Sequence, residues 1–263
     1  PPDPAGLAGR LREPTGAWIA MHPADIAVLR HLAHQSMEER RTTIATQLRR
    51  AGFPEEDVEA LRRTDPLPAS VAPDRELADG DVIDHPGRDL RAVWTPGHSP
   101  GHLCLHLADG DMLFTGDHVL PRITPHIGQF PLTADTGNPL GDFLTSQSSI
   151  AGTTDAERLM CLPSHERRFT DLPRRTEEIT THHQERLDET TALLTDGPAT
   201  LWEVTSRLPW RRSWNDMRVQ ARHMAAAETA AHLRLLEEVG RAHRTGPETL
   251  PRWVAVKPSG LPT

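Results

Sequence analysis

The chain has 263 residues, of which 37% are apolar and 25% charged, and it carries a net charge of −8 at pH 7. This length and apolar fraction suit one large domain with a hydrophobic core plus a smaller one. No apolar run approaches the roughly 20 residues that span a bilayer, and the first residues lack the basic flank and apolar core of a signal peptide. We therefore expect a cytoplasmic protein without a membrane segment. The net charge disfavours polyanion binding over the whole surface but leaves room for a local basic patch.

Helical patterns dominate the first quarter of the chain. Residues 7–16 predict a short helix, and the apolar run 17–21 predicts a strand after it. Amphipathic spacing predicts several helices over residues 22–63, which we interpret as a cap or insertion over a sheet. A proline-rich linker at 65–75 then separates these helices from the strands that follow.

Short strands alternate with turns in the middle of the chain. The pattern predicts strands within residues 81–97, 103–117 and 156–165. Asp109-Gly110, between two apolar runs, predicts a hairpin turn with positive φ. Strands that follow a helical layer indicate an α/β fold. The two cysteines lie inside apolar runs, which favours buried thiols over a disulfide.

A further amphipathic helix ends before Gly197, where we place a domain boundary. Residues 1–195 then form the larger domain and residues 196–263 the smaller one. His182 and His183 lie on this helix in a polar stretch, so we expect both to be solvated.

The smaller domain is predicted to be helical and to end in a hairpin. Thr200 and Glu203 have the spacing of a capping box at the start of a helix. Ser213 with Asp216 predicts the start of a long alanine-rich helix, and two strand-like pieces over 241–256 predict the hairpin.

Three side chains able to bind metal each follow a predicted strand directly. They are His98 in TPGHSPGH, Asp117 in FTGD and His165 in LPSH. Loops at strand ends are where ligands distant in sequence converge. Imidazole nitrogens and a carboxylate suit zinc or a similar ion, and a carboxylate can bridge two metals. Each motif alone is weak, because a single histidine after a strand is more often structural.

In this order, the three motifs resemble the later motifs of the metallo-β-lactamase superfamily. The resemblance covers most of residues 1–195 and implies an αββα sandwich whose leading strands are missing from this sequence. It also implies that His98, Asp117 and His165 are metal ligands. Residues 196–263 resemble the winged helix of one subgroup, which includes hydrolases of esters and thioesters and some nucleases.

The first motif of that family, His-x-His-x-Asp-His followed by glycine, is degraded at the start of this sequence. Alignment on Asp3 and Gly6 puts Pro1 and Pro4 where histidines belong, and proline has no nitrogen lone pair to give a metal. By the same alignment Asp3 is a metal ligand and, with Asp117, one of two catalytic carboxylates. The resemblance thus implies a zinc site that is incomplete in this chain, and we expect weak zinc binding.

Three more histidines are candidates for contact with substrate or for support of the ligands. His102 begins a predicted strand, which favours a structural role or the orientation of His98. His118 and His126 follow Asp117 on a loop that should border the site.

These features support three hypotheses about function. The first is a hydrolase in which a metal-bound hydroxide attacks a small-molecule ester, a thioester or a phosphodiester. The second is a degenerate relative that keeps the fold and acts as a binding protein. The third is nucleic-acid contact through the C-terminal domain, although arginine on a helix more often covers a solvated face. The arginines concerned are Arg211, Arg212, Arg218, Arg222 and Arg234. A homodimer is also among our expectations.

Overall fold

The computed structural model describes residues 5–64, 72–85, 87–132 and 137–256. These residues divide between two compact units that alternate along the chain. The first unit takes in the described parts of Pro1–Ser36, Leu67–His126 and Gly141–Thr180, and the second those of Met37–Pro66, Ile127–Leu140 and Thr181–Thr263. The helices expected to cap the sheet are therefore split between the units, and the domain boundary at residue 196 stays a prediction.

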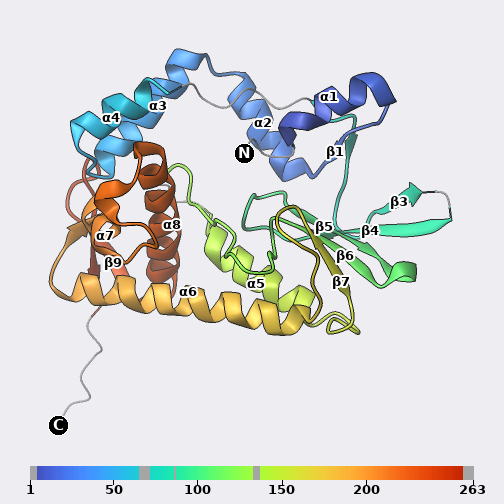
Figure 1. Cartoon of the computed structure of the whole chain (residues 1–263). Helices are drawn as coiled ribbons and strands as arrows, with labels where there is room; N and C mark the ends of the chain where they lie inside the picture. Colours follow the sequence, from blue (N-terminus) through green and yellow to red (C-terminus); the bar gives the residue numbers. More distant parts are fainter. Residues whose placement is uncertain (1–4, 65–71, 86, 133–136, 257–263) are drawn as a thin grey trace, which may run out of the picture. The chain divides into compact units, whose positions relative to one another are not determined.

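The first unit contains a five-stranded sheet with the strand order β3-β4-β5-β6-β7 (Figure 1). Its strands are β3 (Val82–His85), β4 (Arg88–Trp94), β5 (Leu103–Leu107), β6 (Met112–Gly116) and β7 (Met160–Pro163). Neighbouring strands are antiparallel except β6 and β7, which are parallel. The predicted strands and the mixed α/β fold class are confirmed.

Helices and one short strand pair complete this unit. They are α1 (Ala5–Thr15), α2 (Pro23–Ala33), most of α5 (Pro139–Ala151), the start of α6 (Leu172–Thr195), and the parallel pair β1 (Ala20–Met21) and β2 (Arg75–Glu76). The first helix and the strand after it are thus confirmed. Among the described helices of the whole chain, none is both long and apolar enough to cross a bilayer.

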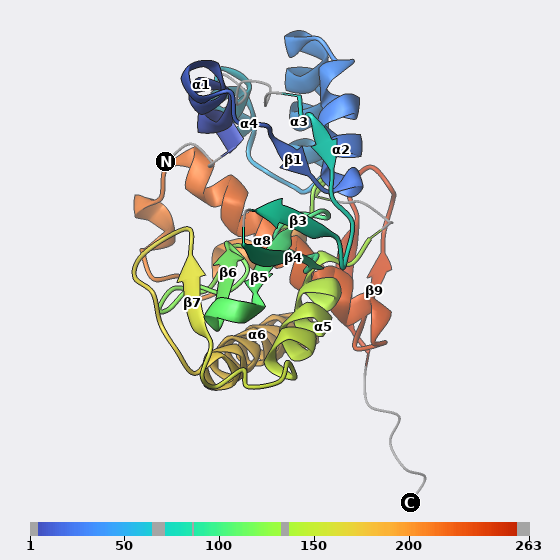
Figure 2. The same ribbon diagram turned by 90° about the vertical axis from the view of Figure 1, so that its right-hand side faces the viewer.

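The five-stranded sheet, which Figure 2 shows from another side, has two faces that differ in the burial of their largest side chains. One face carries Cys104, Leu113 and Cys161, which are buried, and both cysteines are free thiols as predicted. On the other face Trp94 and Phe114 are 44% and 40% exposed, although Ala92 and Leu107 on that face are buried. By strand register, this second face consists of Ile83, Leu90, Ala92, Trp94, Leu103, Leu105, Leu107, Met112, Phe114, Met160 and Leu162. A sheet face in water normally carries polar residues, so this apolar face is unlike a solvated one.

The hairpin between β5 and β6 is confirmed, but its turn differs from the prediction. Residues Ala108–Gly110 form a single 3-10 turn, and the positive φ of 47° falls on Asp111. Aspartate tolerates this left-handed conformation better than most residues, because its short side chain can bond locally. The glycine at 110 therefore does not make the sharp bend.

The second unit is mainly helical. Its elements are α3 (Met37–Arg50), α4 (Glu55–Arg62), the remainder of α6, β8 (Ala199–Thr200), α7 (Leu201–Arg207), α8 (Val219–Glu238), β9 (Ala242–Thr245) and β10 (Arg252–Ala255). The strand order is β8-β10-β9, and β9 pairs with β10 in the predicted hairpin. The capping box is confirmed, because Thr200 and Glu203 each accept a hydrogen bond from the other's backbone N–H.

Two predictions in this unit are wrong. Ser213 does not start the long helix: it precedes a 3-10 turn, Trp214–Asp216, and α8 begins only at Val219. His183 is buried rather than solvated, because its helix packs against α8, where His183 Nδ1 lies 3.2 Å from His232 Nε2. The polar sequence around His183 gives no indication of this contact, so the residue was predicted to be solvated.

Candidate functional site

His98 lies in a tight loop that joins β4 to β5. At the base of the loop, the Thr95 N–H donates to the His102 carbonyl over 2.9 Å. Gly97 has a φ of 142°, and a Cβ there would lie 2.4 Å from the Phe143 Cβ on α5. Only glycine allows the loop to approach α5 this closely. The loop therefore presents His98 from a fixed base at one end of the sheet.

The ring of His98 is oriented by the backbone of His126. His98 Nδ1 lies 2.9 Å from the His126 carbonyl oxygen. A carbonyl only accepts, so Nδ1 carries a proton, and Nε2 is the ring nitrogen that faces Asp117. Nε2 lies 3.8 Å from Asp117 Oδ2. His126 thus supports His98 through its main chain in this structure.

Asp117 brings the second histidine into the same site. It follows β6 directly, and its Oδ1 lies 3.3 Å from Nε2 of His165, which follows β7. The Ser164 hydroxyl donates to the same oxygen. The parallel pairing of β6 and β7 explains this proximity, because parallel strands end at the same edge of a sheet. The carboxylate of Asp117 therefore lies between two imidazoles from two other loops.

His102 and His118 lie behind these residues in the interior. Their rings stack with centroids 5.5 Å apart, and the His118 ring packs edge-on against Phe143. Thr95 Oγ1 lies 2.8 Å from His102 Nδ1. Burial lowers the pKa of His102 to about 4 and that of His118 well below its ordinary value. Both rings are therefore neutral at physiological pH, and His118 is fully buried rather than at the surface of a loop.

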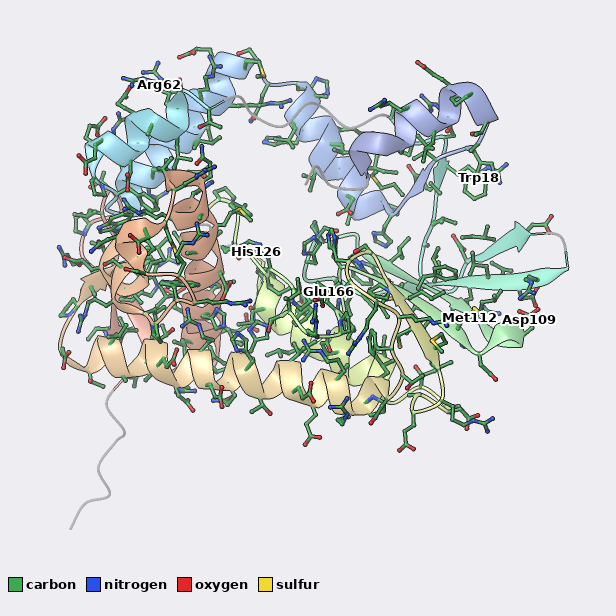
Figure 3. All side chains as sticks on the ribbon, viewed as in Figure 1. Trp18, Arg62, Asp109, Met112, His126 and Glu166 are labelled. Carbon is green, nitrogen blue, oxygen red and sulfur yellow. The ribbon has the colours of Figure 1, made fainter. Side chains whose placement is uncertain are left out.

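The loop that carries His126 is held by side chains from later in the chain. Buried Arg175, in the first turn of α6, donates from Nε to the Leu120 carbonyl over 2.7 Å and from Nη2 to the Ile123 carbonyl over 2.9 Å. Glu166, which follows β7, holds the same loop by accepting hydrogen bonds from Arg122. Figure 3 places His126 and Glu166 at one end of the sheet, and Asp109 and Met112 at the other.

The donor set agrees in part with a zinc-type metal site. Donor atoms bonded to one tetrahedral ion at about 2.1 Å lie roughly 3.4 Å apart. The 3.3 Å and 3.8 Å separations from Asp117 to the two imidazoles are close to this value. Within the described ranges, however, no group of three or more His, Cys, Asp or Glu side chains is placed to hold an ion. Asp3, Pro1 and Pro4 lie outside the described residues.

Comparison with known proteins decides the family. A model of the metallo-beta-lactamase superfamily matches residues 2–168. The chain belongs to the metallo-beta-lactamase superfamily. A crystal structure of a metallo-beta-lactamase family protein from Thermus thermophilus is 31% identical, with a TM-score of 0.74 over 97% of this chain and 77% of that one.

Curated relatives of this metallo-beta-lactamase superfamily chain are similar over shorter stretches. The lactamase-like protein adaB of Aspergillus niger is 33% identical over 118 residues, which make up 45% of this chain and 33% of adaB. The atrochrysone carboxyl ACP thioesterase of Aspergillus fumigatus is 41% identical over 69 residues, 26% of this chain and 21% of that protein. The chain thus matches about a third of the length of adaB and of similar lactamase-like proteins.

Sequence reasoning missed several residues that shape this superfamily site. Ser164 was passed over because a serine before a histidine has no distinctive spacing. Glu166 and Arg175 were hidden because each contact spans more than 40 positions along the chain. Asp25, which contacts the His98 loop, looked like an ordinary acidic residue in the first turn of a helix.

Proposed function

We propose that this chain is a metal-dependent hydrolase that acts on an ester or a thioester of a small molecule. The observation that supports it best is the meeting of His98 and His165 at the carboxylate of Asp117, each from a different strand end. Superfamily membership supports a hydrolase, and the thioesterase among the relatives supports a thioester over a phosphodiester.

The chain's own residues would hold and shape the metal site. His98, Asp117 and His165 would be the ligands among the described residues, and zinc suits their nitrogen and oxygen donors. A zinc ion supplies Lewis-acid polarisation of a carbonyl and lowers the pKa of a bound water. The Ser164 hydroxyl fixes one oxygen of Asp117, and the His126 carbonyl fixes the tautomer of His98. Fixing the ligands in this way reduces the reorganisation needed when an ion binds.

The hydrolase proposal is favoured over nucleic-acid contact by the burial of α8. This helix would have to enter a groove of DNA, as the second helix of a winged-helix-like unit. Its buried positions are Ala225, Ala226, Ala227, Thr229, Ala230, Ala231, His232, Leu233 and Leu236. Successive residues of a helix point about 100° apart, so these positions cover most sides of it. Two of the candidate arginines are also engaged, Arg222 with Asp57 and Arg234 with Glu237.

The proposal is tested by thioester and ester hydrolysis with zinc supplied. Acyl N-acetylcysteamine thioesters, with free thiol as the readout, would be compared with p-nitrophenyl acetate and bis-p-nitrophenyl phosphate. Asp117→Asn should lower thioester hydrolysis by at least about 100-fold, because the loss of a residue that merely supports a metal ligand already costs about 10–100-fold. The matched control is His106→Gln, because His106 lies within β5, away from the strand-end loops. Equal rates in wild type and Asp117→Asn, or faster cleavage of the phosphodiester, would contradict the proposal.

A further inference from the structure

Asp25, on α2, lies outside the metal-ligand motifs but contacts the loop that carries His98. We propose that Asp25 is a positioning residue that fixes the loop carrying His98 and so sets the direction of the His98 imidazole. The importance of His98 for catalysis rests on the proposed function, but the positioning itself does not.

Asp25 binds the loop through both of its carboxylate oxygens. Oδ1 accepts from the Gly101 N–H over 2.7 Å, and Oδ2 accepts from the Ser99 hydroxyl over 2.8 Å. Both partners lie within three residues of His98 and more than 70 residues from Asp25 along the chain. Hydrogen bonds to a charged acceptor are about twice as strong as neutral ones. The pair of bonds therefore fixes the half of the loop that follows His98.

The loop has no space to move closer to α2 or to carry another residue at position 101. A Cβ at Gly101 would lie 2.7 Å from both the Cγ and the backbone nitrogen of Asp25. Real Cβ atoms do not come this close to other heavy atoms, so the contact requires glycine here. This close packing indicates that the loop and the first turn of α2 fit together as one unit.

The start of α2 is itself fixed against the strand that leads into the loop. His22 caps the helix by accepting from the Ala24 N–H over 3.2 Å. The same imidazole stacks on Trp94, the last residue of β4, with ring centroids 5.1 Å apart and an angle of 6° between the planes. Asp25 therefore acts from a base that is anchored on the sheet.

Three different elements thus restrain His98. Phe143 on α5 lies against Gly97 before it, Asp25 holds the residues after it, and the His126 carbonyl fixes its ring. The backbone bonds at the base of the loop do not involve Asp25. Loss of the carboxylate should therefore free the tip of the loop without separating β4 from β5.

The experiment compares Asp25→Ala and Asp25→Asn with Asp79→Ala in the full chain. Asp79 is the matched control, because its carboxylate also accepts a backbone N–H at this end of β4, that of Trp94 over 2.8 Å, but does not hold the loop. The first readout is the long-range ¹H–¹⁵N NMR spectrum of the His98 ring without metal, assigned by its loss in His98→Gln. The second is zinc affinity, measured by competition with a chromophoric chelator.

We expect one sharp His98 tautomer with the proton on Nδ1 in wild type and in Asp79→Ala. Asp25→Ala should give averaged or doubled His98 signals and about 10-fold weaker zinc binding, and Asp25→Asn should recover part of both, since its amide keeps one acceptor oxygen. Unchanged His98 signals in folded Asp25→Ala would overturn the proposal, as would equal changes in Asp79→Ala. Absence of zinc binding and hydrolysis in wild type would sink the proposed function alone, because the metal-free spectrum still decides the role of Asp25.

Discussion

The carboxylate of Glu166 accepts hydrogen bonds from both the backbone N–H and the guanidinium of Arg122, over 3.1 Å and 3.0 Å. Glu166 directly follows His165, and Arg122 lies on the loop after Asp117. This pair therefore ties together the two loops whose side chains meet at the candidate metal site.

Glu166→Gln should weaken this link in a pH-dependent way. Burial by itself raises the pKa of Glu166, but the hydrogen bonds and charge of Arg122 bring it to a net value below the ordinary 4.5. A lowered pKa means that the charged form stabilises the fold above about pH 4.5 and that this contribution is lost as the pH falls further. The Tm of wild type should therefore exceed that of Glu166→Gln at pH 7, and the gap should close toward pH 3. A gap that stays constant over this range would contradict the prediction.

His232→Gln should make the second unit less sensitive to mild acid. Burial lowers the pKa of His183 to about 2 and that of His232 to about 4. The unfolded chain takes up protons on these residues below about pH 6.5, whereas the folded chain does not, so stability falls as the pH drops. Each histidine should cost about 2 kcal/mol at pH 5 relative to pH 7.5. Urea unfolding at both pH values measures this, with exposed His31→Gln as the control. An equal loss of stability in wild type and His232→Gln would show the prediction wrong.

Gly97→Ala should destabilise the fold more than Gly80→Ala. Both glycines have positive φ, but a Cβ at Gly97 would overlap Phe143, whereas nothing lies within 4 Å of a Cβ at Gly80. The difference between the variants combines the steric overlap with the greater backbone strain of a side chain at φ 142° than at φ 79°, and we expect at least about 1–3 kcal/mol. Chemical denaturation of both variants gives this difference directly. Similar unfolding free energies would contradict the prediction, because they would mean that α5 moves to accommodate the added Cβ with little loss of stability.

Pro4→His should tighten zinc binding if, as the sequence alignment predicts, position 4 is that of a metal-binding histidine in the superfamily's first motif. The described ligands do not make a group of three on one ion, and an imidazole at position 4 would add a nitrogen donor. Elemental analysis after dialysis against zinc should find more metal in Pro4→His than in the original chain. Pro2→His serves as the control, because position 2 is not aligned with a ligand. Near-stoichiometric zinc in the original chain would remove the reason for the prediction.

Much of the sheet and the central part of the site followed from the sequence. Strands such as Met112–Gly116 are apolar runs with turn residues on either side, and such local patterns predict strands from the sequence alone. The proximity of His98 and Asp117 was expected because each lies just beyond the end of a predicted strand; in the structure Asp117 directly follows β6, and His98 lies in the loop after β4. Their distance of 3.8 Å was not predictable as a number, only as proximity.

The remaining errors arose where tertiary contacts override local patterns. His183 lies in a polar stretch of sequence, and only the packing of α6 on α8 makes it buried. Asp25 has the composition of a normal helix start, and its partners lie 74 and 76 residues away. No periodicity in one sequence encodes a contact at such a separation.

The apolar face of the five-stranded sheet also affects the solubility of the purified protein and its binding to hydrophobic dyes and resins. Trp94 and Phe114 are 44% and 40% exposed on this face, and exposed apolar side chains of this kind bind hydrophobic dyes and detergents. The purified chain of 263 residues should therefore increase the fluorescence of the dye ANS, bind to a hydrophobic resin and precipitate in part at high salt. Handling at low salt with a mild detergent would keep the material in solution long enough for the measurements above.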